Sequence, residues 1–190
     1  MELFKEIEKQ IKTQKKVVIA IDGPSASGKS TFGNMLKNKY NALLFHTDNY
    51  FLPKERQTID RLKESGGNVD YERIKSDIID NLHNEYLKSN HFNCVTNQLE
   101  KKQKLKNKQV IIIEGAYSMH PSLFPYYTLT VLLEVNPKLQ KTRILARNGK
   151  IMLKRWEEEW IPLENHYFKT ENLKNKVDFI IDLRVSINNK

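Results

Sequence analysis

The densest group of chemically useful side chains lies between residues 23 and 31. The segment GPSASGKST matches the pattern G-x-x-x-x-G-K-[ST] at Gly23, Gly28, Lys29 and Ser30. Small residues let a backbone curl until its N–H groups converge on phosphate oxygens, and the helix that follows presents its positive end to the same anion. In this pattern the lysine reaches the β- and γ-phosphates and the hydroxyl binds Mg²⁺. We therefore expect ATP and Mg²⁺ to bind at Gly23, Ser25, Ala26, Ser27, Gly28, Lys29, Ser30 and Thr31, with Lys29 also catalytic.

A phosphate-binding loop does not define the reaction, and a small-molecule kinase needs three further groups. These are a base for the acceptor hydroxyl, an acidic partner for the metal, and mobile cations for the transferred phosphoryl group. Asp48, in LLFHTDNYFLP, follows an apolar run and is a candidate base, although a loop or helix-capping role is an alternative. Glu114, in IIIEG, is a candidate for holding Mg²⁺ or its water, with capping again the alternative.

The mobile cations would come from the segment RILARNGKIMLKRW. Arg147 is the first candidate, and Lys150, Lys154 and Arg155 follow it in a flexible lid over approximately residues 147–160. An exposed helical face is the alternative for each of them. Asp70, in SGGNVDYERI, either caps the helix that begins at residue 71 or grips a sugar diol, and the two roles are compatible.

The elements that must position these residues alternate between strands and helices. Continuous apolar runs predict buried strands, and helical spacing or a favourable proline predicts helices. The predicted strands are residues 17–21, 42–45, 110–113, 128–135 and 178–183; the predicted helices are residues 2–14, 31–40, 71–88, 137–148 and 150–170, the last interrupted at Pro162. This alternation indicates an α/β fold with a parallel sheet covered by helices on both faces. Ligands in such folds bind beyond the carboxyl ends of the strands, where the sequence places Asp22-Gly23, His46 to Asp48 and Glu114-Gly115.

Composition limits the remaining possibilities. A chain of 190 residues that is 39% hydrophobic suits one domain over residues 1–190. The one cysteine, Cys94, allows no internal disulfide and is expected to be a small packed side chain. With no long apolar run and no secretory signal pattern, we expect a soluble cytoplasmic protein without a membrane partner. The net charge of +9 is compatible with a surface that binds nucleic acid or with a basic cleft that binds anionic substrates. The lysine-rich run at 100–108 is typical of a solvated face.

Five segments together resemble the uridine kinases and their phosphoribulokinase-like relatives. GPSASGKST, HTDNYF, GGNVDYERI, IIIEGAYS and RILARN occur in the order seen in that family, and the resemblance covers about residues 16–183. It implies a P-loop kinase fold with a five-stranded parallel sheet in the order 2-3-1-4-5. It also implies that Asp48 is the base for a ribose 5′-hydroxyl, that Asp70 lies at the ribose hydroxyls and that Glu114 lies near Mg²⁺. Arg147 resembles the first lid arginine, and Tyr50 and Phe51 would flank the acceptor.

Two departures from the family pattern concern the acceptor. The lid segment NGKIMLKRW lacks the arginine-rich pattern of family nucleoside kinases, and a small hairpin insertion at approximately residues 90–100 offers Phe92 and Asn97 without the family histidine. Our first expectation is a kinase for the 5′-hydroxyl of uridine or cytidine. A kinase for another hydroxylated metabolite, of the nicotinamide riboside, pantothenate or sugar type, is the alternative, and a nucleotide-gated nucleic-acid-binding protein is the third. A homo-oligomer is compatible with each, and the preference between ATP and GTP stays open.

Overall fold

The computed structural model describes residues 2–93, 96–100 and 103–182. Its centre is a five-stranded parallel sheet with the strand order β2-β7-β1-β8-β9. These strands span, in the same order, Leu43–His46, Val110–Glu114, Val17–Asp22, Leu129–Glu134 and Phe179–Asp182. Numbered along the chain within this sheet, the order is 2-3-1-4-5, which confirms the predicted fold class.

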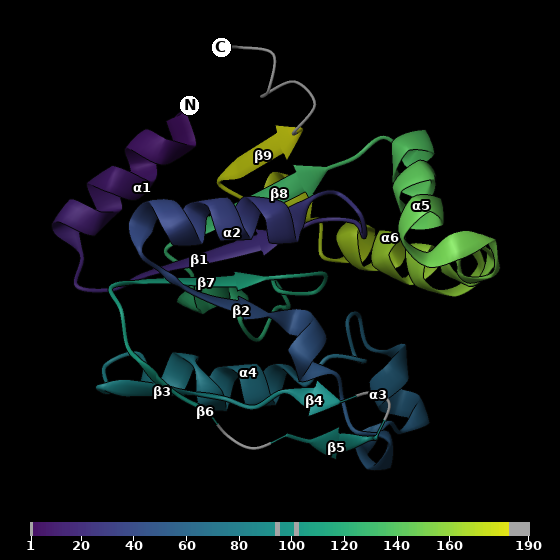
Figure 1. The fold of residues 1–190 in the computed structure, drawn as a ribbon, viewed down its shortest axis with the longest axis horizontal. Coiled ribbons are helices and arrows are strands. Elements are labelled where there is room, and N and C mark those ends of the chain that lie inside the picture. The colour runs from purple at the N-terminus through teal and green to yellow at the C-terminus, as the bar shows by residue number, and fades with distance from the viewer. Residues whose placement is uncertain (1, 94–95, 101–102, 183–190) are drawn as a thin grey trace.

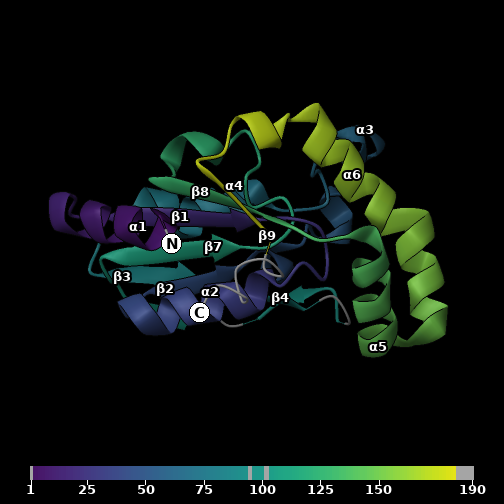
Figure 2. The same cartoon turned by 90° about the horizontal axis from the view of Figure 1, so that it is seen from above.

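Both faces of the sheet are covered, as Figures 1 and 2 show. Every residue of β1 and β7 is buried, which explains why their sequences are continuous apolar runs. On one face pack α1 (Glu2–Thr13) and α2 (Lys29–Tyr40), whose core residues include Ile7 and Leu36. On the other face pack α4 (Tyr71–Asp77) and α6 (Ile161–Thr170), which contribute Ile74 and Tyr167.

The predicted helix over residues 71–88 is wrong beyond its first two turns. Helix α4 ends at Asp77, a 3₁₀ turn spans Ile79–Asn81, and β3 (Tyr86–Ser89) pairs antiparallel with β6 (Gln103–Lys106). Ile74 and Ile78 are fully buried as the helical spacing predicts, but Tyr86 is 45% exposed whereas Leu87 is completely buried. Burial therefore changes from a helical period to an alternating one, as a strand with one face on the core requires.

Two short antiparallel pairs extend this face of the molecule. The lysine-rich run includes β6, whose residues are mostly exposed, in agreement with a solvated face; residues 101 and 102 lie outside the described residues. The second pair joins β4 (Phe92–Asn93) to β5 (Gln98–Leu99) and forms the hairpin expected near residues 90–100. Cys94 lies outside the described residues.

The segment after β8 forms a bent helical arm beyond the carboxyl ends of the strands (Figure 1). Helix α5 (Pro137–Arg155) is broken at Gly149, whose φ of +80° and ψ of 171° are not helical. A π-helical turn (Trp156–Trp160) then leads into α6, which has Pro162 in its first turn. The predicted break near residue 148 is confirmed, and the second interruption precedes Pro162. Among the described residues, no helix has the length and apolar character needed to cross a membrane.

Candidate active site

The loop between β1 and α2 has the shape of a phosphate-binding cradle. Gly23 (φ +147°), Ala26 (φ +60°) and Gly28 (φ +106°) curl the backbone in conformations that L side chains rarely adopt. A Cβ at Gly23 would lie 2.4 Å from the backbone oxygen of Leu133, so only glycine fits there. Gly28 provides no side-chain cap to α2, and this leaves the N–H groups at the start of a 12-residue helix available to an anion.

The side chains of this loop lie where a nucleotide polyphosphate would be bound. Lys29 is only 9% exposed, and its Nζ donates to the backbone oxygens of Gly23 (2.7 Å) and Pro24 (3.0 Å). Ser30 and Thr31 are exposed at the first turn of α2. The hydroxyl of Ser27 is buried without a hydrogen-bond partner in the described part of the chain. A cradle of backbone N–H groups with a lysine and an exposed hydroxyl fits a polyphosphate with its Mg²⁺.

Asp22, to which the sequence analysis gave no separate role, anchors the base of this loop. Its carboxylate accepts the backbone N–H groups of Gly23 (2.7 Å) and Met119 (3.0 Å) and the hydroxyl of Tyr167 (2.8 Å). Burial raises the pKa of Asp22 to about 6, although these hydrogen bonds and the Lys29 charge oppose the rise. An apolar strand that ends in a carboxylate was the available sequence signal.

Asp22 predicts a measurable pH dependence of stability. Because its folded-state pKa of about 6 lies above the ordinary 3.8, the folded protein binds this proton more tightly than the unfolded chain does. The cost of the buried charge is therefore largest above pH 6 and falls as the pH drops through 6 toward 3.8. We expect the free energy of unfolding of the wild type, minus that of Asp22→Asn, to rise by up to about 3 kcal/mol between pH 7 and pH 4. Urea unfolding at several pH values measures the difference, and a flat difference would contradict the assignment.

Glu114 lies at the end of β7, directly beside His46 at the end of β2. The Nδ1 atom of His46 and the carboxylate of Glu114 form a hydrogen bond, which raises the pKa of His46 against the opposing effect of burial. A Cβ at Gly33 would lie 3.4 Å from Cγ of Glu114, so this carboxyl group packs under α2 one turn after Ser30. Ser30 and Glu114 are thus suited to hold Mg²⁺, which binds proteins through one or two groups and takes its other ligands from phosphate and water.

Asp48 is exposed on the 3₁₀ turn Thr47–Tyr50 that directly follows β2. The turn is fixed to the segment that follows β7, because Oγ1 of Thr47 donates to the backbone oxygen of Ala116 (3.0 Å). A side chain at Gly115 would collide with Thr47, its Cβ lying 1.8 Å from Oγ1, and this glycine also has a φ of +137°. The fold therefore brings the ends of β1, β2 and β7 to one edge, with an accessible carboxylate beside the loop.

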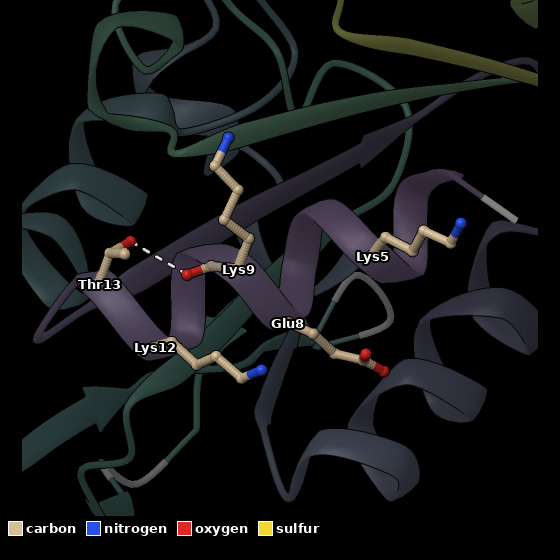
Figure 3. Close-up of a pocket in the computed structure, with 5 residues that line it drawn as sticks. All are labelled: Lys5, Glu8, Lys9, Lys12 and Thr13. Carbon is tan, nitrogen blue, oxygen red and sulfur yellow. Dashed lines mark hydrogen bonds between the residues drawn. The ribbon is translucent and has the colours of Figure 1, made fainter.

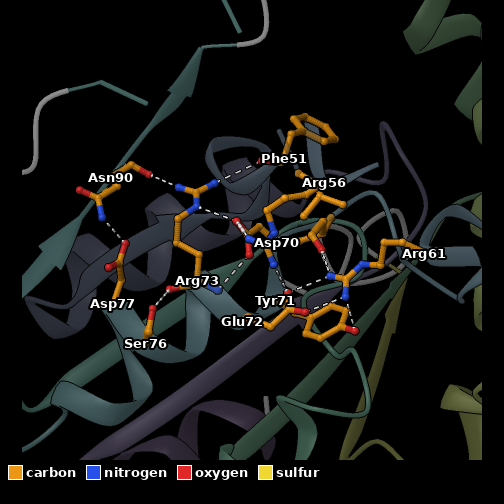
Figure 4. A network of polar contacts seen from close by, with 12 residues as sticks. Phe51, Arg56, Arg61, Asp70, Tyr71, Glu72, Arg73, Ser76, Asp77 and Asn90 are labelled. Atoms are coloured by element: carbon orange, nitrogen blue, oxygen red, sulfur yellow. Dashed lines mark hydrogen bonds and ion pairs between the residues drawn. The ribbon is translucent and has the colours of Figure 1, made fainter. Parts of the chain in front are cut away.

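Asp70 caps α4 and forms ion pairs with two arginines (Figure 4). One of its oxygens accepts the Arg73 backbone N–H (3.1 Å), and the other accepts Nε of Arg73 (3.2 Å) and Nη1 of Arg56 (2.8 Å). Asp70 is 2% exposed, so capping is the role that the present geometry displays. Tyr50 is a core residue beneath the Arg73 guanidinium, whereas Phe51 is half-buried and bridges to Val69 through its backbone.

Arg147, the expected lid arginine, does not contact the loop in this structure. Its Nε donates to Oδ1 of Asn148 (2.8 Å), and its guanidinium lies 5.9 Å from the centre of the Trp156 ring. The arginine of α5 that does contact the loop is Arg143, whose Nη1 donates to the backbone oxygen of Ala26 (2.9 Å). Lys154 and Arg155 pair with Glu158 and Glu159 on the outer surface.

Gln140 and Glu164 are further residues that the sequence analysis missed. Nε2 of Gln140 donates to the backbone oxygen of Ser25 (3.1 Å), and Glu164 accepts the backbone N–H of Ser25 (2.9 Å) and its hydroxyl. Burial raises the pKa of Glu164, the Lys29 charge opposes that rise, and the Asp48 charge adds to it. Lys29 and Asp48 therefore lie within electrostatic reach of this carboxylate.

The segment that contains the hairpin near residues 90–100 contacts the turn that carries Asp48. Nε2 of His91 lies 3.4 Å from Nδ2 of Asn49, the neighbour of Asp48. Asn97 bonds to Glu55 (2.8 Å), while Phe92 is 8% exposed. This hairpin thus lies beside the 3₁₀ turn Thr47–Tyr50 and the segment that follows it.

One four-residue match to the N-K-x-D pattern, by which GTPases read guanine, occurs at residues 175–178. Asp178 lies immediately before β9 and accepts the backbone N–H and the hydroxyl of Thr130 (2.8 and 2.7 Å). That position is at the amino ends of the parallel strands, opposite to the phosphate-binding loop, so this segment cannot read a base bound there.

Two cavities lie outside the cradle itself. One, of about 380 Å³, is an open hollow over the exposed α1 side chains shown in Figure 3. The other, of about 300 Å³, lies at the carboxyl ends of β8 and β9 and is lined by Pro24, Asn136, Asn165 and Phe168, among others. Only the second adjoins the phosphate-binding loop.

Comparison with known proteins supports the fold. No family model matches the chain. A cytidylate kinase of Mesomycoplasma hyopneumoniae (strain 7448) is 28% identical over 198 residues, covering 87% of this chain and 85% of that protein. A possible uridine kinase from Bacillus stearothermophilus superposes with a TM-score of 0.65 at 21% identity, over 96% of this chain and 100% of the other. A putative fructose transport system kinase from Silicibacter sp. TM1040 gives 0.67 at 18% identity, over 88% and 90%. The chain thus has the P-loop kinase fold.

Proposed function

We propose that this chain is an ATP- and Mg²⁺-dependent kinase that phosphorylates a hydroxyl group of a small molecule, with the 5′-hydroxyl of uridine or cytidine as the first candidate. The observation that carries the proposal is the exposed carboxylate of Asp48 at the same sheet edge as the phosphate-binding loop. A phosphate-binding loop alone would serve many NTPases, but a base beside it suits transfer to an alcohol.

In the proposed reaction Asp48 accepts the proton of the acceptor hydroxyl as its oxygen forms a bond to the γ-phosphorus. The bond between that phosphorus and the β–γ bridging oxygen breaks, and ADP leaves. Lys29 and the N–H groups of the loop stabilise charge on the phosphate oxygens; Mg²⁺, when bound, would supply further positive charge there. Ser30 and Glu114 would hold the metal, and the arm that carries Arg147 would close over the phosphates.

A second candidate acceptor class is a hydroxylated metabolite other than a pyrimidine nucleoside. Within this class, an acceptor without a ribose diol is favoured by Asp70, the residue that resemblance places at ribose hydroxyls, because Arg56, Arg73 and the start of α4 already engage both of its carboxylate oxygens. In this arrangement the Asp70 carboxylate is 2% exposed and accepts three hydrogen bonds, so a ribose diol has little access to it. The cytidylate kinase relative also makes a nucleoside monophosphate a necessary member of any acceptor panel.

The proposal predicts acceptor-dependent release of ADP from Mg-ATP. A coupled assay measures this release with each acceptor in turn: uridine, cytidine, CMP, UMP, nicotinamide riboside, pantothenate and simple sugars. We expect turnover with uridine or cytidine. Activity with one of the last three and none with the pyrimidines would favour the second candidate. ADP release that no acceptor stimulates would contradict a kinase function.

A further inference from the structure

The backbone carbonyl, backbone N–H and hydroxyl of Ser25 are all hydrogen-bonded to the two helices of the arm, α5 and α6. Gln140 of α5 bonds to its carbonyl oxygen, and Glu164 of α6 accepts its N–H and its hydroxyl. Arg143 adds a bond to the next carbonyl oxygen, that of Ala26. We call Gln140, Arg143 and Glu164 the Ser25 clamp.

The clamp connects the loop to the lid at both of the lid's ends. Gln140 and Arg143 precede the break at Gly149, and Glu164 follows the π-helical turn Trp156–Trp160. A Cβ built on Gly149 would have no atom of the described residues within 4 Å, so none of their side chains packs against that side of the break in the helix. A movement of Ser25 would therefore be transmitted to both stems of the lid.

Glu164 differs from the other two members because it is an anion in a site built for anions. It is 4% exposed, and it occupies a backbone N–H donor within the phosphate-binding loop. Burial raises the pKa of Glu164, and the positive charge of Lys29 opposes that rise, as it would also attract a bound polyphosphate. Two anions that share one cation in a partly buried site repel each other by amounts on the order of kcal/mol.

We propose that Glu164 is a positioning residue that couples occupancy of the phosphate-binding loop to the position of the lid. Its carboxylate holds Ser25 while the loop is empty. An incoming polyphosphate competes for the same positive surroundings, loosens that contact and frees α6 together with the lid. This inference rests on the proposed function only in requiring that the loop binds a polyphosphate; it requires no acceptor.

The two tryptophans of the chain, Trp156 and Trp160, both lie on the lid and report its movement. The test titrates the full-length protein with inorganic tripolyphosphate and follows tryptophan fluorescence, with calorimetry as an independent measure of binding. Glu164→Gln keeps the side-chain shape and an acceptor oxygen for Ser25 but removes the charge. We expect its tripolyphosphate midpoint to fall by about tenfold relative to the wild type. Glu164→Ala removes the contact as well and should reduce the fluorescence change upon binding.

Glu158→Gln is the matched control because it removes a lid carboxylate whose side chain is 62% exposed. Its midpoint should equal that of the wild type. A Glu164→Gln midpoint that is unchanged or higher would overturn the competition, as would absence of tripolyphosphate binding to the wild type. Binding seen by calorimetry without a fluorescence change would overturn the coupling. Failure of every acceptor in the kinase assay, with the tripolyphosphate results as expected, would refute the proposed function and leave this inference standing.

Discussion

The Asp48→Asn variant is expected to turn over at least about 10²-fold more slowly than the wild type, while its affinity for ATP stays nearly unchanged. Asparagine matches aspartate in shape but cannot accept the proton of an attacking hydroxyl. Asp48 is exposed, so the substitution should disturb neither the core nor the loop that binds the phosphates. Steady-state kinetics with the best acceptor, together with a calorimetric titration of ATP, separate the two quantities.

A suitable control for this variant is Asp60→Asn. Its side chain is 95% exposed and forms an ion pair with the neighbouring, likewise exposed Lys63. We expect wild-type turnover from it, since it removes the same charge away from the sheet edge. Near-full turnover by Asp48→Asn would show that another group accepts the proton, or that the attacking atom carries none.

The sheet and the loop could be predicted from sequence because their signals are local. Continuous apolar runs such as residues 110–113 mark strands buried on both faces, and the glycine pattern fixes where the chain must curl. The prediction of a helix over residues 71–88 was wrong because it relied on such a local signal where the tertiary structure decides burial. Ile74, Ile78, Leu82 and Tyr86 share a helical spacing, but Leu87 is the residue that the tertiary structure buries.

The contacts that hold the loop could not be predicted, because they join residues far apart in the chain. Arg143 is 117 residues from Ala26, and Glu164 is 139 residues from Ser25. No spacing rule relates such pairs; only the packing of α5 and α6 beyond the strand ends brings them together. Asp70 shows the intermediate case. Its capping role follows from its position before α4, but its pairing with Arg56 depends on how the segment over residues 54–66 folds back.

The largest loss of catalytic efficiency is expected from replacement of Lys29. This residue is expected to contact the nucleotide and also stabilises the folded protein. Lys29→Met should lower kcat/KM for ATP by about 10³-fold, since a preorganised donor to the transferred phosphate is lost. It should also weaken tripolyphosphate binding, which sets it apart from Asp48→Asn. Kinetics and calorimetry on the same two variants test this contrast.

Lys29→Met should in addition destabilise the fold at neutral pH. The positive charge of Lys29 favours the ionised forms of Asp22 and Glu164, both of them buried, and its ammonium group satisfies two backbone oxygens. Its loss leaves two carboxylates without that compensation, and we expect the free energy of unfolding at pH 7 to fall by about 2 kcal/mol or more. The loss should shrink as the pH drops, because protonation of the carboxylates removes the charges that Lys29 compensates. Urea unfolding of the wild type, Lys29→Met and the charge-retaining Lys29→Arg at pH 7 and pH 5 distinguishes this electrostatic role from simple packing, for which the loss would be equal at both pH values.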